Sequence, residues 1–153
     1  MRREPRPGEP AATDRLREPP ARRLADPELV VDIAAVTATL RGEPGGPTQH
    51  GHRQMAVLHR GHMRVVLFTF DAGGELPDHT ANGIVSIHVL SGELTVRTQR
   101  AEHRLRAGMV LVLDPLIAHS VMAAQPAEML LTVHLDQSLG TSREAQGEGR
   151  PEA

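Results

Sequence analysis

The chain lacks cysteine, lysine, tryptophan and tyrosine altogether, and it has two phenylalanines, Phe68 and Phe70, among its 153 residues. The absence of cysteine excludes disulfides, thiolate metal ligands and a cysteine nucleophile. Any metal must therefore be held by histidine or oxygen ligands, which suit Zn, Mn, Fe, Ni or Cu. With so few aromatic rings the core must be aliphatic, and base stacking on an aromatic platform is not expected.

Charge and hydropathy give no sign of a nucleic-acid or membrane partner. The net charge is −2 and the sequence pI is near 6.5, so there is no basic field to attract polyanions. No apolar run reaches the length of about eighteen residues that a membrane span needs. The charged N-terminal end also lacks the apolar stretch of a signal peptide. We therefore expect a cytoplasmic protein that binds neither nucleic acid nor membrane.

Composition divides the chain into three regions. Residues 1–26 are crowded with Pro, Arg, Glu and Ala, and residues 136–153 are similarly poor in apolar side chains. Both segments are predicted to be disordered tails because they offer little surface to bury. Residues 27–135 lie between them and are long enough to form one domain with a single core.

One helix is predicted at the start of this domain, over residues 27–41. Asp26 can cap it, Pro27 suits its first turn, and Gly42 with Pro44 ends it. Its apolar side chains recur at helical spacing, so this stripe is expected to pack on the rest of the domain or on a second subunit. The stripe consists of Leu29, Ile33, Val36 and Leu40.

The rest of the domain, from about residue 54 to residue 135, is predicted to consist of short strands. Glycine, proline and aspartate separate segments that are rich in β-branched and aliphatic residues. These segments are 64–70, 84–90, 93–98, 109–114 and 129–135. Several short strands at this spacing are typical of an all-β fold, a small antiparallel barrel or jelly roll.

Two segments that begin with glycine carry histidines at defined spacing. The first has the pattern G-x5-H-x-A-x3-V-x6-G and comprises Gly73, His79, Ala81, Val85 and Gly92. The second places Asp114, Leu116, His119 and Ala123 at fixed distances after Gly108.

In these two segments the chain resembles the small single-domain cupins. The motifs of that family are G-x5-H-x-H-x3-E-x6-G and G-x5-P-x-G-x2-H-x3-N, and the resemblance covers about residues 54–135. The most similar stretches are LPDHTANGIVSIHVLSG (76–92) and DPLIAHSV (114–121). The resemblance implies a cupin-type β-barrel, or jelly roll, preceded by one N-terminal helix.

In metal-bearing members of this family three histidines and one glutamate bind a divalent metal inside the barrel. By position, His79 and His119 match two of the histidines, whereas Ala81 and Val85 replace the other histidine and the glutamate. The resemblance therefore implies an incomplete metal site, and a ligand pocket that is drier and more apolar than usual. We expect this pocket to be lined by the same four residues.

Other histidines can be considered as additional metal ligands. His103 and His134 could face inward, although the sequence does not fix their register, whereas alternation turns His88 away from the face of Val85. A further group, which we call the loop histidines, could bind metal but is more typical of a solvated surface. It comprises His50, His52, His59 and His62. Asp78 and Asp114 are the acids closest to the site histidines and could orient them.

Three functions are compatible with these residues. One is a metal-dependent enzyme of the dioxygenase or isomerase type that acts on a small organic substrate. Another is a non-catalytic protein that binds a small molecule in the barrel, with or without a divalent metal, and the depleted ligand set favours it. The third is a structural or interaction module. The resemblance also implies a homodimer, since an incompletely closed barrel leaves strand edges to be paired.

Overall fold

A computed structural model describes residues 27–136 of the chain. The predicted disordered tails, 1–26 and 136–153, therefore lie outside the described residues except for Asp136. The chain divides into two compact units between Gly46 and Pro47. No helix within residues 27–136 is long and apolar enough to cross a membrane.

The helix of the first unit, α3, spans Ile33–Arg41. The prediction that it starts at Pro27 is wrong, because the carboxylate that accepts a first-turn N–H is that of Asp32, at 3.1 Å from the Ala35 nitrogen. Its end is as predicted, with Gly42 donating its N–H to the Ala38 carbonyl. Val36 and Leu40 of the predicted apolar stripe are buried. The surface on which this stripe packs stays a prediction.

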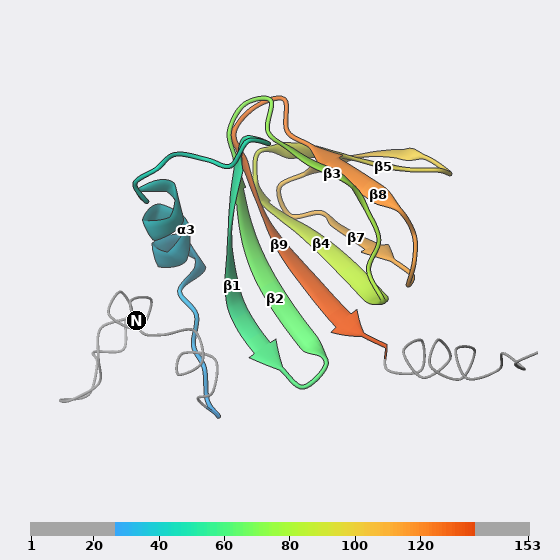
Figure 1. Ribbon diagram of the computed structural model, residues 1–153, viewed down its shortest axis with the longest axis horizontal. Coiled ribbons are helices and arrows are strands. Elements are labelled where there is room, and N and C mark those ends of the chain that lie inside the picture. Colours follow the sequence, from blue (N-terminus) through green and yellow to red (C-terminus); the bar gives the residue numbers. More distant parts are fainter. Residues whose placement is uncertain (1–26, 137–153) are drawn as a thin grey trace, which may run out of the picture. The chain divides into compact units, whose positions relative to one another are not determined.

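The second unit is built from antiparallel strands in two sheets (Figure 1). One sheet has the strand order β1-β2-β9-β4-β7, and the other has the order β3-β8-β5-β6. The strands are β1 (His52–Arg60), β2 (Met63–Phe70), β3 (Glu75–His79), β4 (Gly83–Ser91), β5 (Glu93–Thr98), β6 (Glu102–Arg106), β7 (Val110–Leu113), β8 (His119–Met122) and β9 (Ala127–Leu135). The all-β fold is confirmed, and each of the five predicted segments overlaps a strand.

The core lies between the two sheets and follows from strand alternation. On β4, every second residue is buried, and Val85, Ile87 and Val89 are at most 2% exposed. The four-stranded sheet contributes aliphatic side chains such as Leu94 and Val96 to the same cluster. The core is aliphatic as predicted, and both phenylalanines of β2 belong to it.

The turn between β4 and β5 requires a glycine. Gly92 has a φ of 74°, and a Cβ on it would lie 2.6 Å from the Pro126 carbonyl oxygen. A side chain here would combine an unfavourable backbone conformation with a steric clash. This glycine therefore fixes the close approach of the β4–β5 turn to the start of β9.

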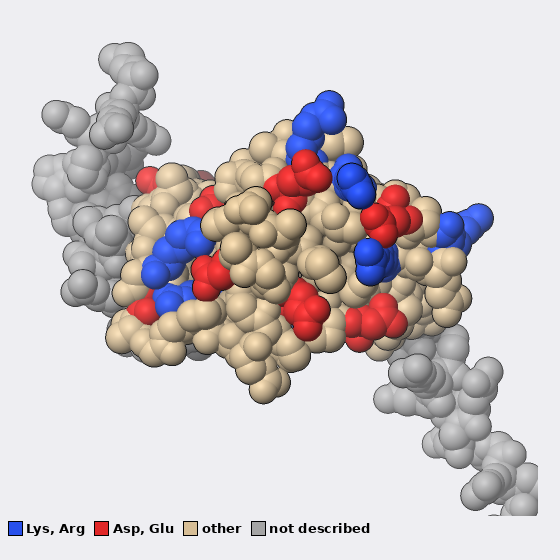
Figure 2. All heavy atoms as spheres, turned by 90° about the horizontal axis from the view of Figure 1, so that it is seen from above, with Lys and Arg blue, Asp and Glu red and all other residues tan. Residues whose placement is uncertain are grey.

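The charged side chains of the unit are mixed in sign. On the face drawn in Figure 2, arginines and acidic residues alternate rather than gather in fields of one sign. On the four-stranded sheet, for example, the Arg97 Nε lies 2.8 Å from a carboxylate oxygen of Glu102. This distribution gives no patch of one charge on that face.

Candidate functional site

The fold brings His79 and His119 together from segments far apart in the sequence. His79 ends β3 and His119 begins β8, and the two residues are direct partners in the antiparallel register. Their ring centroids are 4.2 Å apart and the rings are tilted by 57°. The motif spacing thus predicted a pair of histidines that the structure places in contact.

An irregularity in β3 sets the direction of His79. Leu76 pairs with Val121 and His79 with His119, so β3 advances three residues where β8 advances two. Such a bulge lets Leu76 and His79 face the same side although an odd number of steps separates them. Pro77 lies within the bulge, is exposed, and directs its carbonyl oxygen to the His79 ring.

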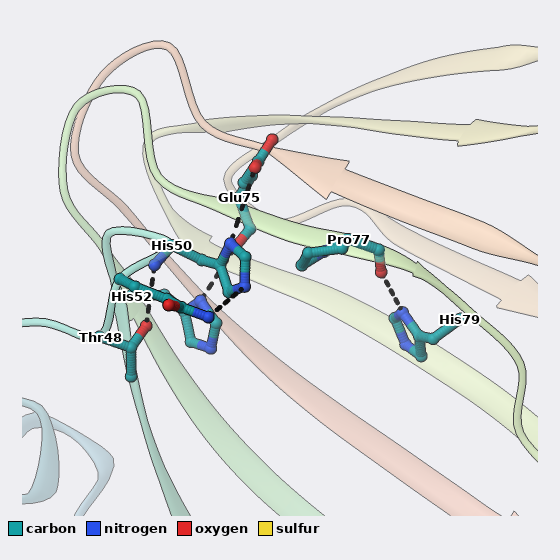
Figure 3. A network of polar contacts seen from close by, with 7 residues as sticks. Thr48, His50, His52, Glu75, Pro77 and His79 are labelled. Carbon is teal, nitrogen blue, oxygen red and sulfur yellow. Dashed lines mark hydrogen bonds and ion pairs between the residues drawn. The ribbon is translucent and has the colours of Figure 1, made fainter.

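Backbone carbonyls orient both histidine rings in the same way. The His79 Nδ1 lies 2.8 Å from the Pro77 oxygen (Figure 3), and the His119 Nδ1 lies 2.8 Å from the Ile117 oxygen. A carbonyl oxygen can only accept, so each Nδ1 carries the proton, and in the neutral ring each Nε2 is an acceptor. Backbone oxygens thus take the place at both Nδ1 atoms that Asp78 or Asp114 could have taken.

His119 is deeply buried and its Nε2 has no hydrogen-bond partner among the described residues. The side chain is 1% exposed, whereas His79 is partly exposed. Burial lowers the pKa of His119, and the neighbouring His79 adds to this effect, while the Ile117 carbonyl and the charge of Asp78 oppose it. The neutral ring is therefore favoured, with an acceptor atom that the described chain leaves unused.

Ala81 and Val85, the residues that replace metal ligands of the family motif, are both apolar neighbours of the core. Val85 is 2% exposed within the core cluster, and Ala81 is partly buried against it. The carbonyl oxygen of Ala81 accepts a hydrogen bond of 3.0 Å from the Leu116 nitrogen. This bond ties the loop before β8 to the loop after β3.

Leu116 is held in an unusual backbone conformation beside this site. Its φ is 66°, and among the described residues no other side-chain-bearing residue has a positive φ. It stands where the cupin motif has a glycine, the residue that adopts a positive φ without steric cost. The left-handed conformation costs about 1–2 kcal/mol for a residue with a Cβ. The side chain is also 48% exposed, which is unusual for a leucine.

The other histidines do not join the pair. His134, whose register the sequence left open, is exposed and alternates with the buried side of β9. His103 is partly buried and shares the inward face of β6 with Leu105, but its partner across the ladder is Val96. Within residues 27–136, no group of three or more His, Asp or Glu side chains is placed to hold a metal.

The site residues therefore do not fit a metal held by the protein alone. Two Nε2 atoms are available, from His79 and His119, whereas catalytic zinc sites, for comparison, have three protein ligands. Ala81 and Val85 offer no donor atom in their side chains. A metal at this position would need its remaining ligands from water or from a bound molecule.

The loop histidines separate into two kinds. His52 is 6% exposed and donates from Nδ1 to the Glu75 carbonyl oxygen at 2.9 Å (Figure 3). Its ring also contacts Phe68 and Phe70. His50 stacks on His52, and its Nδ1 lies 3.7 Å from a Glu75 carboxylate oxygen. The remaining two, His59 and His62, are exposed. His52 thus acts as a core residue at one end of the barrel.

Sequence reasoning missed the groups that orient the site. Pro77, Ile117 and Glu75 act through backbone carbonyls, which every residue has, so no side-chain pattern could single them out. The one available signal was Leu116, since a non-glycine residue at a motif glycine indicates a strained turn.

Comparisons with known proteins agree with this architecture. Neither a protein-family model nor a curated protein matches the chain, whereas solved structures do. A cupin superfamily protein from Desulfitobacterium hafniense has a TM-score of 0.58 at 17% identity, over 74% of this chain and 95% of that one. An RmlC-like cupin from Shewanella frigidimarina has a TM-score of 0.55 at 18% identity, over 62% and 86%. An RmlC-like cupin from Desulfovibrio desulfuricans is 33% identical over 53% of this chain and 79% of that one, with a TM-score of 0.50.

Two facing antiparallel sheets with a histidine pair joined across β3 and β8 define a small jelly-roll barrel. Together with these structural neighbours, this shows that the chain belongs to the cupin family, as a small cupin-type domain. The predicted family and fold are thus confirmed.

Proposed function

We propose that this cupin binds a small organic molecule inside its barrel, at His79 and His119, with Ala81 and Val85 lining the pocket. The observation that carries the proposal is the Nε2 of His119, which is buried and has no partner among the described residues. A buried polar atom without a partner costs about 1–3 kcal/mol, so a bound group that pairs with it is favoured. The orientation of both rings by carbonyls adds support, because it presents two acceptors in fixed positions.

The alternative is a metal-dependent enzyme of the dioxygenase or isomerase type. The fixed Nδ1–H tautomers support it, since metal-ligating histidines commonly donate their other ring nitrogen to a carbonyl or carboxylate. The incomplete ligand set weighs against it, because Ala81 and Val85 supply no donor. The absence of donor atoms at Ala81 and Val85 thus favours binding of a small molecule over catalysis at a metal.

Elemental analysis of protein purified without a histidine tag separates these two functions. We compare the wild type with the His79→Ala/His119→Ala double variant, and use His59→Ala/His134→Ala, which removes two exposed histidines, as the matched control. If the protein binds its ligand without a metal, we expect less than about one-tenth of an equivalent of metal per protein chain in all three proteins. Near-stoichiometric metal that only the site variant loses would instead support the enzyme. The binding proposal itself fails if no small molecule from a broad screen stabilises the wild type more than the site variant.

We also propose that the protein is a homodimer, paired through β7. Three of the four sheet edges carry features that discourage pairing: β1 has a bulge and arginines at Arg53 and Arg60, β3 has a bulge and Pro77, and β6 is charged. By contrast, β7 reads VLVL, without charge, proline or bulge. Its outward side chains Val110 and Val112 are 52% and 59% exposed. A second copy presents the same strand, and antiparallel pairing of identical edges satisfies a twofold axis.

Sedimentation of the wild type and of Val112→Lys tests the homodimer. We expect the wild type to be a dimer at micromolar concentration and the variant to be a monomer, because a lysine on an edge strand opposes pairing. Met122→Lys is the matched control, since Met122 is 43% exposed on the other sheet, and it should stay dimeric. A monomeric wild type would overturn this proposal. It would also remove the support that dimerisation gives to the third function, a structural or interaction module.

A further inference from the structure

We infer that the molecule bound at this site is uncharged and largely apolar, and that it presents one O–H or N–H group to Nε2 of His119. This inference rests on the proposed function and adds the chemical class of the ligand. It follows from which atoms near His119 are already paired, and from the residue types around it.

The first step is that His119 offers an acceptor and nothing else. Its Nδ1 is occupied by the Ile117 carbonyl at 2.8 Å, so the ring proton is on that nitrogen. The remaining atom, Nε2, carries a lone pair that must be met by a donor. A ligand oxygen without a hydrogen would place two lone pairs opposite each other in a buried position.

The second step is that neighbouring side chains do not supply this donor. Across the ladders, His119 has His79 on β3 and Thr98 on β5. The Thr98 hydroxyl donates to the Ala101 carbonyl, and the ring proton of His79 goes to the Pro77 carbonyl. Both neighbours have thus used their donors elsewhere, which is why Nε2 of His119 is left for a ligand.

The third step concerns charge. Asp78 lies close enough for its negative charge to act on His119, and the basic group among those that do is the imidazole of His79 rather than an arginine. An anionic ligand such as a carboxylate would therefore meet a negative charge and an acceptor, with no permanent cation among those groups to offset its desolvation. Ala81 and Val85, where the family motif has polar ligands, instead offer apolar contact. An uncharged molecule with an apolar body suits these surroundings.

Three probes of similar size test this ligand class: benzyl alcohol, toluene and benzoate. Dissociation constants are measured by NMR titration of protein with ¹⁵N-labelled histidine at about pH 8, where an ordinary imidazole is neutral. We expect benzyl alcohol to bind about five-fold or more tightly than toluene, because its hydroxyl satisfies a buried acceptor. We expect benzoate to bind more weakly than either, and the Nε2 resonance of His119 to shift only with benzyl alcohol.

Two variants show whether the preference depends on His119. His119→Phe keeps a ring but removes the acceptor, so it should bind toluene at least as well as benzyl alcohol. His119→Gln, whose amide oxygen is again an acceptor, should keep part of the preference and covers the case in which the phenylalanine variant does not fold. His134→Phe, on the exposed side of β9, is the matched control and should behave as the wild type.

The outcomes distinguish this inference from the function on which it rests. Equal binding of toluene and benzyl alcohol, or tightest binding of benzoate, overturns the ligand class. If that binding is still lost in His79→Ala/His119→Ala, the proposed function stands. Failure of all three probes to bind overturns the inference, and the wider ligand screen then decides the proposed function.

Discussion

His119 shows how one side chain can be fixed by its neighbours and still be left incomplete. The Ile117 carbonyl sets its tautomer, burial lowers its pKa, and its second nitrogen has no partner among the described residues. Polar groups buried in this way are uncommon in stable cores and are often found where a ligand completes them. Its chemistry can be examined without knowing that ligand, since the cost of protonating the ring appears in the stability of the protein.

Stability should therefore depend on pH through His119. Burial lowers its pKa in the folded protein, whereas the unfolded chain takes up a proton near the usual pKa of 6.5. As pH falls through and below that value, the unfolded state binds more protons, so the free energy of unfolding decreases. Urea unfolding at about pH 8 and about pH 5.5 should show a smaller loss for His119→Gln than for the wild type. An equal loss in both proteins would contradict this, and His134→Gln should match the wild type.

Leu116 should be replaceable by glycine with a gain in stability. Its φ of 66° is unfavourable for any residue with a Cβ, and glycine relieves this cost. We expect Leu116→Gly to raise the free energy of unfolding by about 1 kcal/mol, part of the relief being offset by the freer unfolded chain. Leu116→Ala keeps the Cβ and should show no such gain. Thermal unfolding of the wild type and the two variants tests this prediction. A glycine variant less stable than the alanine variant would contradict it.

At the scale of elements, the sequence predicted five of the nine strands among the described residues and missed β1, β3, β6 and β8. Segments overlapping β2, β4, β5, β7 and β9 were recognised by their aliphatic residues. Two of the missed strands, β3 and β6, read ELPDH and EHRLR, and they lie at the two edges of the four-stranded sheet. Strand propensity reflects how well a residue fits a half-buried surface. Short edge strands that contain proline or charged residues therefore cannot be recognised from their sequence pattern. The helix start was misplaced for a related reason, since Asp26 and Asp32 are equally good caps by type.

The turns offer a matched test of how much a glycine contributes. Gly92 and Gly108 both have positive φ, at 74° and 87°. A Cβ at Gly92 would meet the Pro126 oxygen and Ala127, whereas a Cβ at Gly108 would meet no atom within 4 Å. Gly108→Ala should thus lose about 1–2 kcal/mol from the backbone alone, and Gly92→Ala about 1–3 kcal/mol more from the clash. Chemical denaturation measures both, and equal losses would mean that the β4–β5 turn moves away from β9 without cost.

For the whole molecule, the motif spacing predicted more of the site than periodicity did. Two glycine-bounded segments placed His79 and His119 together correctly, and alternation placed His88 away from Val85. The register of the remaining histidines depends on how strands pair across the barrel, which no local pattern encodes. The direction of His134 was left open for that reason, and the carbonyls that hold the site rings could not be foreseen from side chains at all.

The position of β3 at the rim of its sheet has a consequence for access. β3 pairs with β8 on one side only, through a ladder broken by a bulge, whereas β9 is paired on both sides by β2 and β4. Singly paired strands open at lower free energy than doubly paired ones, and their amide hydrogens exchange sooner with solvent. We expect local detachment of β3 to carry His79 away and uncover His119 while the five-stranded sheet stays paired. Local opening of β3 would thus give a small molecule access to His119 without unfolding of the whole protein.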